Sequence, residues 1–236
     1  MLKKISLLIV SILLFQSVIR AQDLQTDLSL KYLVRQAASG AGKSPVLILL
    51  HGYGSNEADL FELRNTFPGH FIIVAPQAPM AIGNRAYQWY NISNPAGQPA
   101  DLQKSTALLQ RFIGEVVRKY HADPANVYLA GFSQGGVMSY QLGLTHPELV
   151  KGIGALSGKI AQSLKQDVKV TAALQRLRIF IGHGTADERI AYKEAEAANT
   201  YLRSLKLNPS FHTYQGMAHQ ISNDELKDFL QWLSGK

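Results

Sequence analysis

The sequence predicts an α/β fold in which a mainly parallel central sheet is covered by helices on both faces. Short apolar segments bounded by turn residues alternate with helical patterns along most of the 236 residues. Residues 46–50 and 71–75 are continuous apolar runs, as expected of strands that are buried on both faces. Residues 101–120 carry apolar side chains at helical spacing. Because no linker interrupts the alternation, we expect a single domain.

Each further element has its own signal in the sequence. Residues 28–35 alternate between apolar and polar side chains, which predicts a first strand. Residues 80–100 are rich in Gly, Pro and Asn without a clear period, so we expect a long loop there. The last helix is predicted to begin at Ser222, where the side chains of Ser222 and Glu225 form a capping-box pattern. We expect further strands at residues 127–130, 152–156, 178–181 and 211–214, and further helices at residues 137–144 and in the segment that ends at residue 205.

The N-terminus has the layout of a secretory signal peptide. Two lysines precede an apolar stretch at residues 5–19, and Ala21 follows just before a polar segment. A membrane-spanning helix needs about 20 predominantly apolar residues, so an uncleaved anchor is the weaker alternative. We therefore expect a signal peptide at residues 1–21 and a single domain at residues 22–236. The protein is then periplasmic or secreted, with no stable membrane span after cleavage.

The composition excludes several classes of site. The chain has no cysteine, which rules out disulfides, thiolate metal sites and a thiol nucleophile. Signal-peptide removal takes away three basic residues and lowers the formal charge from +7 to +4. The densest basic stretch, residues 159–178, lacks interleaved aromatic residues, so we expect no nucleic-acid partner. Gly42-Lys43-Ser44 resembles the end of a phosphate-binding loop, but Ala37 stands where that loop needs its first glycine.

Residues 131–135 form the G-x-S-x-G pattern, with Ser133 at its centre. A predicted strand precedes the pattern and a predicted helix follows it, which is the context the pattern requires. Small residues on both sides allow a tight turn that lifts the serine hydroxyl clear of the backbone. We predict that Ser133 is a nucleophile, and an ordinary serine at a helix start is the alternative.

A serine nucleophile needs a base that takes its proton and a carboxylate that orients the base. His219 lies between the last predicted strand and the last helix, at the carboxyl edge of the sheet. Asp187 follows another predicted strand and lies at the same edge. The chain order Ser133, Asp187, His219 is that of the α/β-hydrolase scaffold, which we predict with little or no cap domain. His51 and His183 also end strands at this edge and are expected to hold loop backbones.

Acyl transfer also needs hydrogen-bond donors for the developing oxyanion. We assign one donor to the backbone N–H of Gln134, the residue after the nucleophile. The second donor is the backbone N–H of Tyr53, in the turn His51-Gly52-Tyr53-Gly54 after an early strand. A plain glycine turn is the alternative for this segment. Trp89 and Tyr90, in the predicted long loop, are expected to wall the substrate site.

Several short stretches carry a wider resemblance, spread in order over residues 30–234. They are Leu50-His51-Gly52-Tyr53-Gly54, Ala75-Pro76-Gln77-Ala78-Pro79, Trp89-Tyr90-Asn91-Ile92, residues 129–136, Ala155-Leu156-Ser157-Gly158, His183-Gly184-Thr185-Ala186-Asp187 and Gly216-Met217-Ala218-His219. Together they resemble the phospholipase/carboxylesterase family of α/β-hydrolases, which includes the acyl-protein thioesterases. The resemblance implies the triad and oxyanion donors assigned above. The family often has Leu at the position of Tyr53, a change that a backbone donor tolerates.

These observations predict an exported serine carboxylic-ester hydrolase that works through an acyl-enzyme. Its expected substrates are small-molecule, lipid or glycan esters, with short to medium acyl esters or lysophospholipid-like esters first. We expect no metal and no organic cofactor. An esterase that removes acetyl or feruloyl groups from polysaccharide is the main alternative. A peptidase, or a binding protein that kept the fold without the chemistry, are further alternatives.

Overall fold

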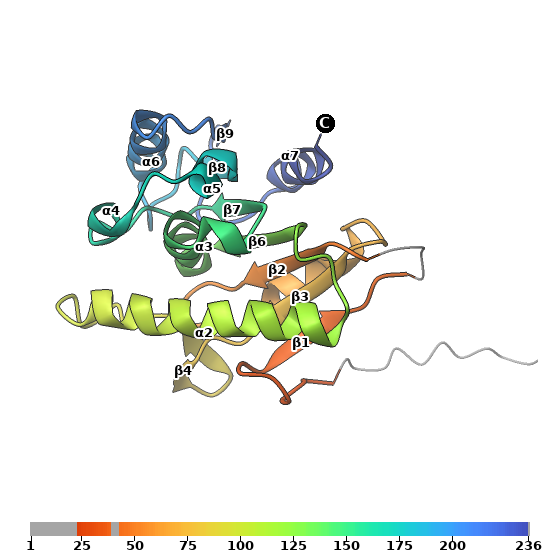
Figure 1. Ribbon diagram of the computed structural model, residues 1–236. Helices are drawn as coiled ribbons and strands as arrows, with labels where there is room; N and C mark the ends of the chain where they lie inside the picture. Colours follow the sequence, from red (N-terminus) through yellow and green to blue (C-terminus); the bar gives the residue numbers. More distant parts are fainter. Residues whose placement is uncertain (1–22, 39–42, 236) are drawn as a thin grey trace, which may run out of the picture.

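The computed structural model describes residues 23–38 and 43–235, so the predicted signal peptide at residues 1–21 lies outside the described residues. A seven-stranded sheet forms the centre of the molecule (Figure 1). Its strands are β1 (Tyr32–Arg35), β2 (Val46–Leu50), β3 (Ile72–Pro76), β6 (Val127–Phe132), β7 (Gly152–Leu156), β8 (Arg178–Gly184) and β9 (Ser210–Tyr214). Their order is β1-β3-β2-β6-β7-β8-β9. β1 is antiparallel to β3, and the other neighbouring pairs of this sheet are parallel.

Helices cover both faces of the sheet. They are α1 (Ala58–Phe61), α2 (Gln98–Lys119), α3 (Gln134–Thr145), α4 (Leu164–Asp167), α5 (Ala172–Arg176), α6 (Tyr192–Ser204) and α7 (Asn223–Leu233), with 3-10 turns at Glu62–Asn65 and Pro147–Leu149. Along β2, Ile48 belongs to the apolar core shared with α2, α3 and α6, whereas Leu47 and Leu49 belong to the core shared with α1 and α7. Because β2 is buried on both faces, its sequence is a continuous apolar run. The predicted fold class is confirmed.

The first strand is shorter than predicted. It begins at Tyr32, and residues 28–30 form bends instead. The backbone N–H of Ser29 donates to the Glu115 carboxylate on α2 rather than to a neighbouring strand. Leu30 belongs to the apolar core that includes α2, and Leu28 packs against it, so the alternating pattern reflects this burial.

The segment predicted as one long loop contains regular structure. Residues 80–100 include the hairpin of β4 (Met80–Gly83) and β5 (Ala86–Gln88), and α2 already begins at Gln98. The hairpin turns at Asn84 and Arg85, with Arg85 at a φ of 53°. Strands of three or four residues are too short to establish a period in the sequence, which is why the prediction missed them.

Half of the predicted capping box forms at the start of α7. The Ser222 hydroxyl accepts from the Glu225 backbone N–H at 3.1 Å. The Glu225 side chain is fully buried, and its carboxyl oxygens make no hydrogen bond of normal geometry to a described residue. It lies over Gly182, where any side chain would overlap the carboxyl. Burial raises the pKa of Glu225 to about 8, against a smaller lowering by the nearby Ser222 N–H.

Candidate active site

Ser133 lies at a sharp turn between β6 and α3. Its φ of 55° and ψ of −114° are a conformation that L residues rarely adopt. Close backbone packing holds the turn. A side chain at Gly131 would overlap the backbone of Gly135, and one at Gly135 would overlap the carbonyl of Leu50. The two glycines of the G-x-S-x-G pattern are therefore required by packing, and the turn presents Ser133 at the carboxyl edge of the sheet.

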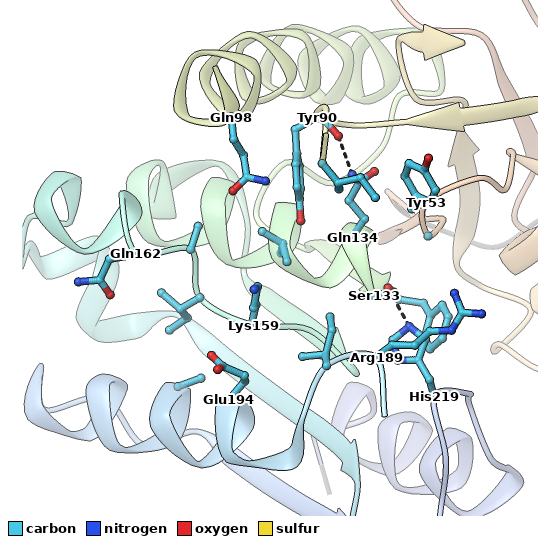
Figure 2. A pocket seen from close by; sticks show the side chains of 18 of the residues that line it. Tyr53, Tyr90, Gln98, Ser133, Gln134, Lys159, Gln162, Arg189, Glu194 and His219 are labelled. Atoms are coloured by element: carbon cyan, nitrogen blue, oxygen red, sulfur yellow. Dashed lines mark hydrogen bonds between the residues drawn. The ribbon is translucent and has the colours of Figure 1, made fainter. Parts of the chain in front are cut away.

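The structure brings the three predicted triad side chains together at this edge. His219 Nε2 lies 2.9 Å from Ser133 Oγ (Figure 2). His219 Nδ1 lies 2.7 Å from Asp187 Oδ2. Because a carboxylate only accepts, Nδ1–H donates to Asp187, and Nε2 is left to accept from the Ser133 hydroxyl. This is the proton arrangement that a general base needs.

The environment of Asp187 favours its ionised form. Burial alone would raise the pKa of this carboxyl, but hydrogen bonds from His219 and from two backbone amides outweigh it and hold the pKa below its ordinary range. The amides belong to Arg189 and Ile190, and each donates to Oδ1 at 2.9 Å. Asp187 therefore stays charged and fixed in orientation.

His183 supports the same carboxylate from behind. Its Nε2–H donates to the Ile190 carbonyl at 2.7 Å and lies 3.2 Å from Asp187 Oδ2. Both side chains are fully buried. The prediction that His183 holds a loop backbone is confirmed, and the loop that it holds is the one that donates to Asp187. Its closeness to the carboxylate had no separate signal in the sequence.

The ring of Phe132 packs against the imidazole of His219, with the ring centroids 4.8 Å apart. Phe132 precedes Ser133 and lines the cavity at the nucleophile. It therefore limits how far His219 can turn. The sequence offered no signal for this contact, because an apolar residue at the end of a buried strand is usually part of the core.

The predicted oxyanion residues flank Ser133. Tyr53 and Gln134 both line the cavity at the nucleophile. No hydrogen bond from either backbone N–H to another described residue is present. His51 fixes the turn that carries Tyr53, because its Nδ1–H donates to the Gly52 carbonyl at 2.7 Å and its Nε2 accepts from the Ala78 N–H at 3.1 Å. Both backbone N–H groups are thus without a partner among the described residues, as the oxyanion prediction requires.

Comparisons with known proteins identify the family of the chain. The family model for phospholipases and carboxylesterases matches residues 36–235. The chain belongs to this phospholipase/carboxylesterase family. Acyl-protein thioesterase 1 from Mycosarcoma maydis is 29% identical over 230 residues, which cover 86% of this chain and 96% of the relative. Carboxylesterase SOBER1 from Arabidopsis thaliana is 28% identical over 174 residues, covering 67% of this chain and 73% of the relative.

A solved structure gives the same result. The crystal structure of esterase PE8 matches with a TM-score of 0.74 at 29% sequence identity, covering 89% of this chain and 99% of the esterase. The family and these relatives identify the chain as a serine hydrolase of the carboxylesterase type.

The prediction that Trp89 lines the substrate site is wrong. Trp89 is 0% exposed and does not line the cavity. Its indole N–H donates to the His51 carbonyl at 3.0 Å, so the ring packs under the loop instead of facing substrate. Tyr90, the next residue, does line the cavity. Residues 89 and 90 lie in a bend, and the hydrogen bond to the His51 carbonyl holds the Trp89 ring away from the cavity.

The Gln134 side chain clamps this segment in place. Its Oε1 accepts from the Trp89 backbone N–H, and its Nε2 donates to the Tyr90 carbonyl, both at 2.7 Å. The side chain is buried. Gln134 thus has two contacts: its backbone lies next to Ser133, and its side chain holds the segment that carries Tyr90. The sequence pattern indicated only the backbone contribution.

The cavity that opens at Ser133 has a volume of about 940 Å³. It is bounded by the turn after β2, the start of α2, the segment after β7 and the exposed side of α6. Within residues 23–38 and 43–235, no group of three metal-ligating side chains is found that could hold a metal ion. None of the helices in the described part of the chain combines the length and apolar character of a membrane span.

Proposed function

We propose that the chain is an exported hydrolase that cleaves carboxylic esters through an acyl-enzyme on Ser133. The observation that carries this proposal is the unbroken hydrogen-bond chain from Ser133 through His219 to Asp187. The signal-peptide layout of residues 1–21 supports export to the periplasm or out of the cell. Short to medium acyl esters and lysophospholipid-like esters are the expected substrates.

Acylation begins when Oγ of Ser133 attacks the acyl carbon while His219 Nε2 takes the hydroxyl proton. The electron pair of the carbonyl moves onto its oxygen, and the amides of Tyr53 and Gln134 stabilise that charge. Asp187 stabilises the imidazolium through its hydrogen bond with Nδ1–H. When the tetrahedral intermediate collapses, the bond to the leaving oxygen breaks and His219 protonates the alcohol.

Deacylation repeats these steps with water in place of Ser133. His219 Nε2 takes a proton from water as the water oxygen attacks the acyl carbon. The same two amides stabilise the second oxyanion, and His219 returns the proton to Ser133 Oγ as the acid leaves. The charged Asp187 serves both half-reactions, because the hydrogen bonds that keep its pKa low do not involve the substrate.

The proposal is tested with p-nitrophenyl acetate and butyrate on the mature protein and on Ser133→Ala. We expect kcat to fall by about 10⁴-fold or more, because nucleophile and base act as a unit. Ser204→Ala, in a serine at the end of α6 that does not line the cavity, is the matched control and should keep full activity. Mass spectrometry after fluorophosphonate treatment should place the adduct on Ser133.

Full activity in Ser133→Ala would overturn the assignment of the nucleophile. A wild-type protein that neither hydrolyses these esters nor reacts with fluorophosphonate would instead be a binding protein on a hydrolase fold.

A further inference from the structure

One arm of the cavity is lined by polar side chains. Figure 2 shows Tyr90, Gln98, Lys159, Gln162 and Glu194 on one side of Ser133, with His219 and Arg189 on the other. The first five residues come from four separate parts of the chain: the segment after β5, the first turn of α2, the segment after β7 and the first turn of α6. We call this part of the cavity the polar arm.

The polar groups of this arm are not used by the fold. Within the described part of the chain, the side chains of Gln98, Lys159, Gln162 and Glu194 form no hydrogen bond or ion pair with another residue. By contrast, Asp59, which lines the cavity near Tyr53, is bonded to the Ser55 hydroxyl at 2.7 Å. Gln98 and Glu194 are half-buried, Lys159 and Gln162 are exposed, and all four line the cavity, so their polar groups are available to a ligand.

Tyr90 gives a second and independent sign of a ligand. The residue is only 6% exposed, yet its hydroxyl points into the cavity and bonds to no described residue (Figure 2). Burial raises the pKa of the phenol above its usual value, so the hydroxyl keeps its proton and remains a donor. The Gln134 clamp fixes the backbone of Tyr90 and so fixes the position of this hydroxyl.

The chemistry of the arm restricts what fits there. Lys159 only donates, Glu194 only accepts, and the two glutamines and Tyr90 do both. A long alkyl chain would remove water from a cation and an anion without replacing their hydrogen bonds. Lys159 and Lys165 both line the cavity, but an anionic group would also meet Glu194, to which it has no proton to donate. Hydroxyl groups both donate and accept, so a group carrying several of them satisfies all these partners.

We propose that the polar arm binds the hydroxyl-rich part of a carbohydrate ester, and that this protein is selective for sugar esters over alkyl esters of the same acyl group. The apolar side chains of Val137 and Ile160, which also line the cavity, are placed to contact the C–H faces of the sugar. This inference rests on the proposed ester hydrolysis at Ser133 and names its substrate class. It favours a glycan ester over a lysophospholipid-like one.

The test compares kcat/KM for 6-O-butyrylglucose, hexyl butyrate and p-nitrophenyl butyrate. We expect wild type to prefer the sugar ester over hexyl butyrate. In Glu194→Leu, the ratio of kcat/KM for the sugar ester to that for p-nitrophenyl butyrate should fall about tenfold, as when a site loses a partner for a substrate hydroxyl. Gln98→Leu, on a different element, should lower the same ratio. Glu196→Leu is the matched control, since Glu196 is an exposed residue of α6 that does not line the cavity.

Several outcomes would overturn the polar arm as a sugar site. One is a wild-type preference for hexyl butyrate. Another is a ratio that stays unchanged in both Glu194→Leu and Gln98→Leu. A third is a preference for an anionic ester, such as a succinate monoester, that Lys159→Met abolishes. If p-nitrophenyl butyrate is not hydrolysed at all, the proposed function itself fails, and this result is distinct from a lack of sugar selectivity.

Discussion

Two buried carboxyl groups, those of Asp187 and Glu225, lie close to β8, and their surroundings differ. Asp187 follows the end of β8 and receives hydrogen bonds from His219, Arg189 and Ile190, which hold its pKa below the ordinary range. Glu225 lies over Gly182 of the same strand and makes no hydrogen bond of normal geometry to a described residue, and its pKa rises to about 8. Both side chains are shielded from solvent.

The comparison shows that burial alone does not decide whether a carboxyl is charged. Removing water disfavours the charged form of both groups, and oriented N–H donors reverse this for Asp187 alone. One carboxylate can therefore serve as a permanent anion beside His219. Burial raises the pKa of the other to about 8, which favours its protonated form at pH 7, and it packs between α7 and β8.

The largest expected effect comes from removing the charge of Asp187. In Asp187→Asn, the amide nitrogen can turn toward His219 and favour the tautomer with its proton on Nε2, which cannot accept from Ser133. We expect kcat for p-nitrophenyl acetate to fall by about 10³- to 10⁴-fold with the fold intact by circular dichroism.

Asp228→Asn is the matched control for this change. Asp228 lies 3.3 Å from His212 and accepts from the Tyr214 hydroxyl, so it forms another Asp–His pair that is not connected to Ser133. This variant should keep kcat within about twofold of wild type. Equal losses in the two variants would mean that Asp187 has no special role in the triad.

Glu225→Gln should alter the pH dependence of stability. Below pH 4.5, the ordinary pKa of this group, the carboxyl is protonated in both the folded and the unfolded chain. Between pH 4.5 and about 8 the unfolded chain releases the proton while the folded chain keeps it, so the free energy of unfolding of wild type falls as pH rises. Glutamine has no such proton.

We therefore expect the variant to gain about 4 kcal/mol over wild type between pH 4.5 and pH 8. The unsatisfied amide lowers the stability of the variant equally at both pH values, so it cancels from this comparison. Urea unfolding at both pH values measures the difference. Parallel stability curves for the two proteins would show that Glu225 is ionised in the folded state.

The smallest of these effects is expected from His183. In His183→Leu the Ile190 carbonyl loses its donor, so the loop that orients Asp187 is less firmly held. We expect kcat to fall about tenfold with little change in KM, because His183 is fully buried and does not line the cavity. His183→Gln, which keeps an N–H at a similar reach, should recover most of the loss. An equal loss in both variants, or a rise in KM alone, would contradict a positioning role.

The sequence predicts the parts of the candidate site that depend on local backbone geometry and on the ends of parallel strands. A side chain at Gly131 or Gly135 would overlap backbone atoms, so the turn requires glycine at both positions. These are the two glycines of the G-x-S-x-G pattern. Asp187 and His219 follow parallel strands, whose carboxyl ends share one edge of the sheet. Those two facts bring residues that are far apart in sequence to one place.

Other features depend on contacts between distant segments and had no local signal. The pair Trp89 and Tyr90 gave no sign of which ring faces the cavity, because the Gln134 side chain and the His51 carbonyl decide it. The capping-box pattern at Ser222 is the same whether Glu225 turns back to the helix end or into the core. The space above Gly182 decides between these outcomes.

The two roles of Gln134 have a consequence for how this enzyme can diversify. Its side chain fastens the segment that carries Tyr90, while its backbone belongs to the turn that carries Ser133. The segment that carries Tyr90 is thus fastened to the turn that carries Ser133. If the polar arm binds sugar as proposed, we expect substitutions at Gln98 and Gln162 to change selectivity without disturbing the turn at Ser133. A change at Gln134 would disturb both the position of Tyr90 and the turn at Ser133. We therefore expect new specificities to arise at positions such as Gln98 and Gln162, with Gln134 unchanged.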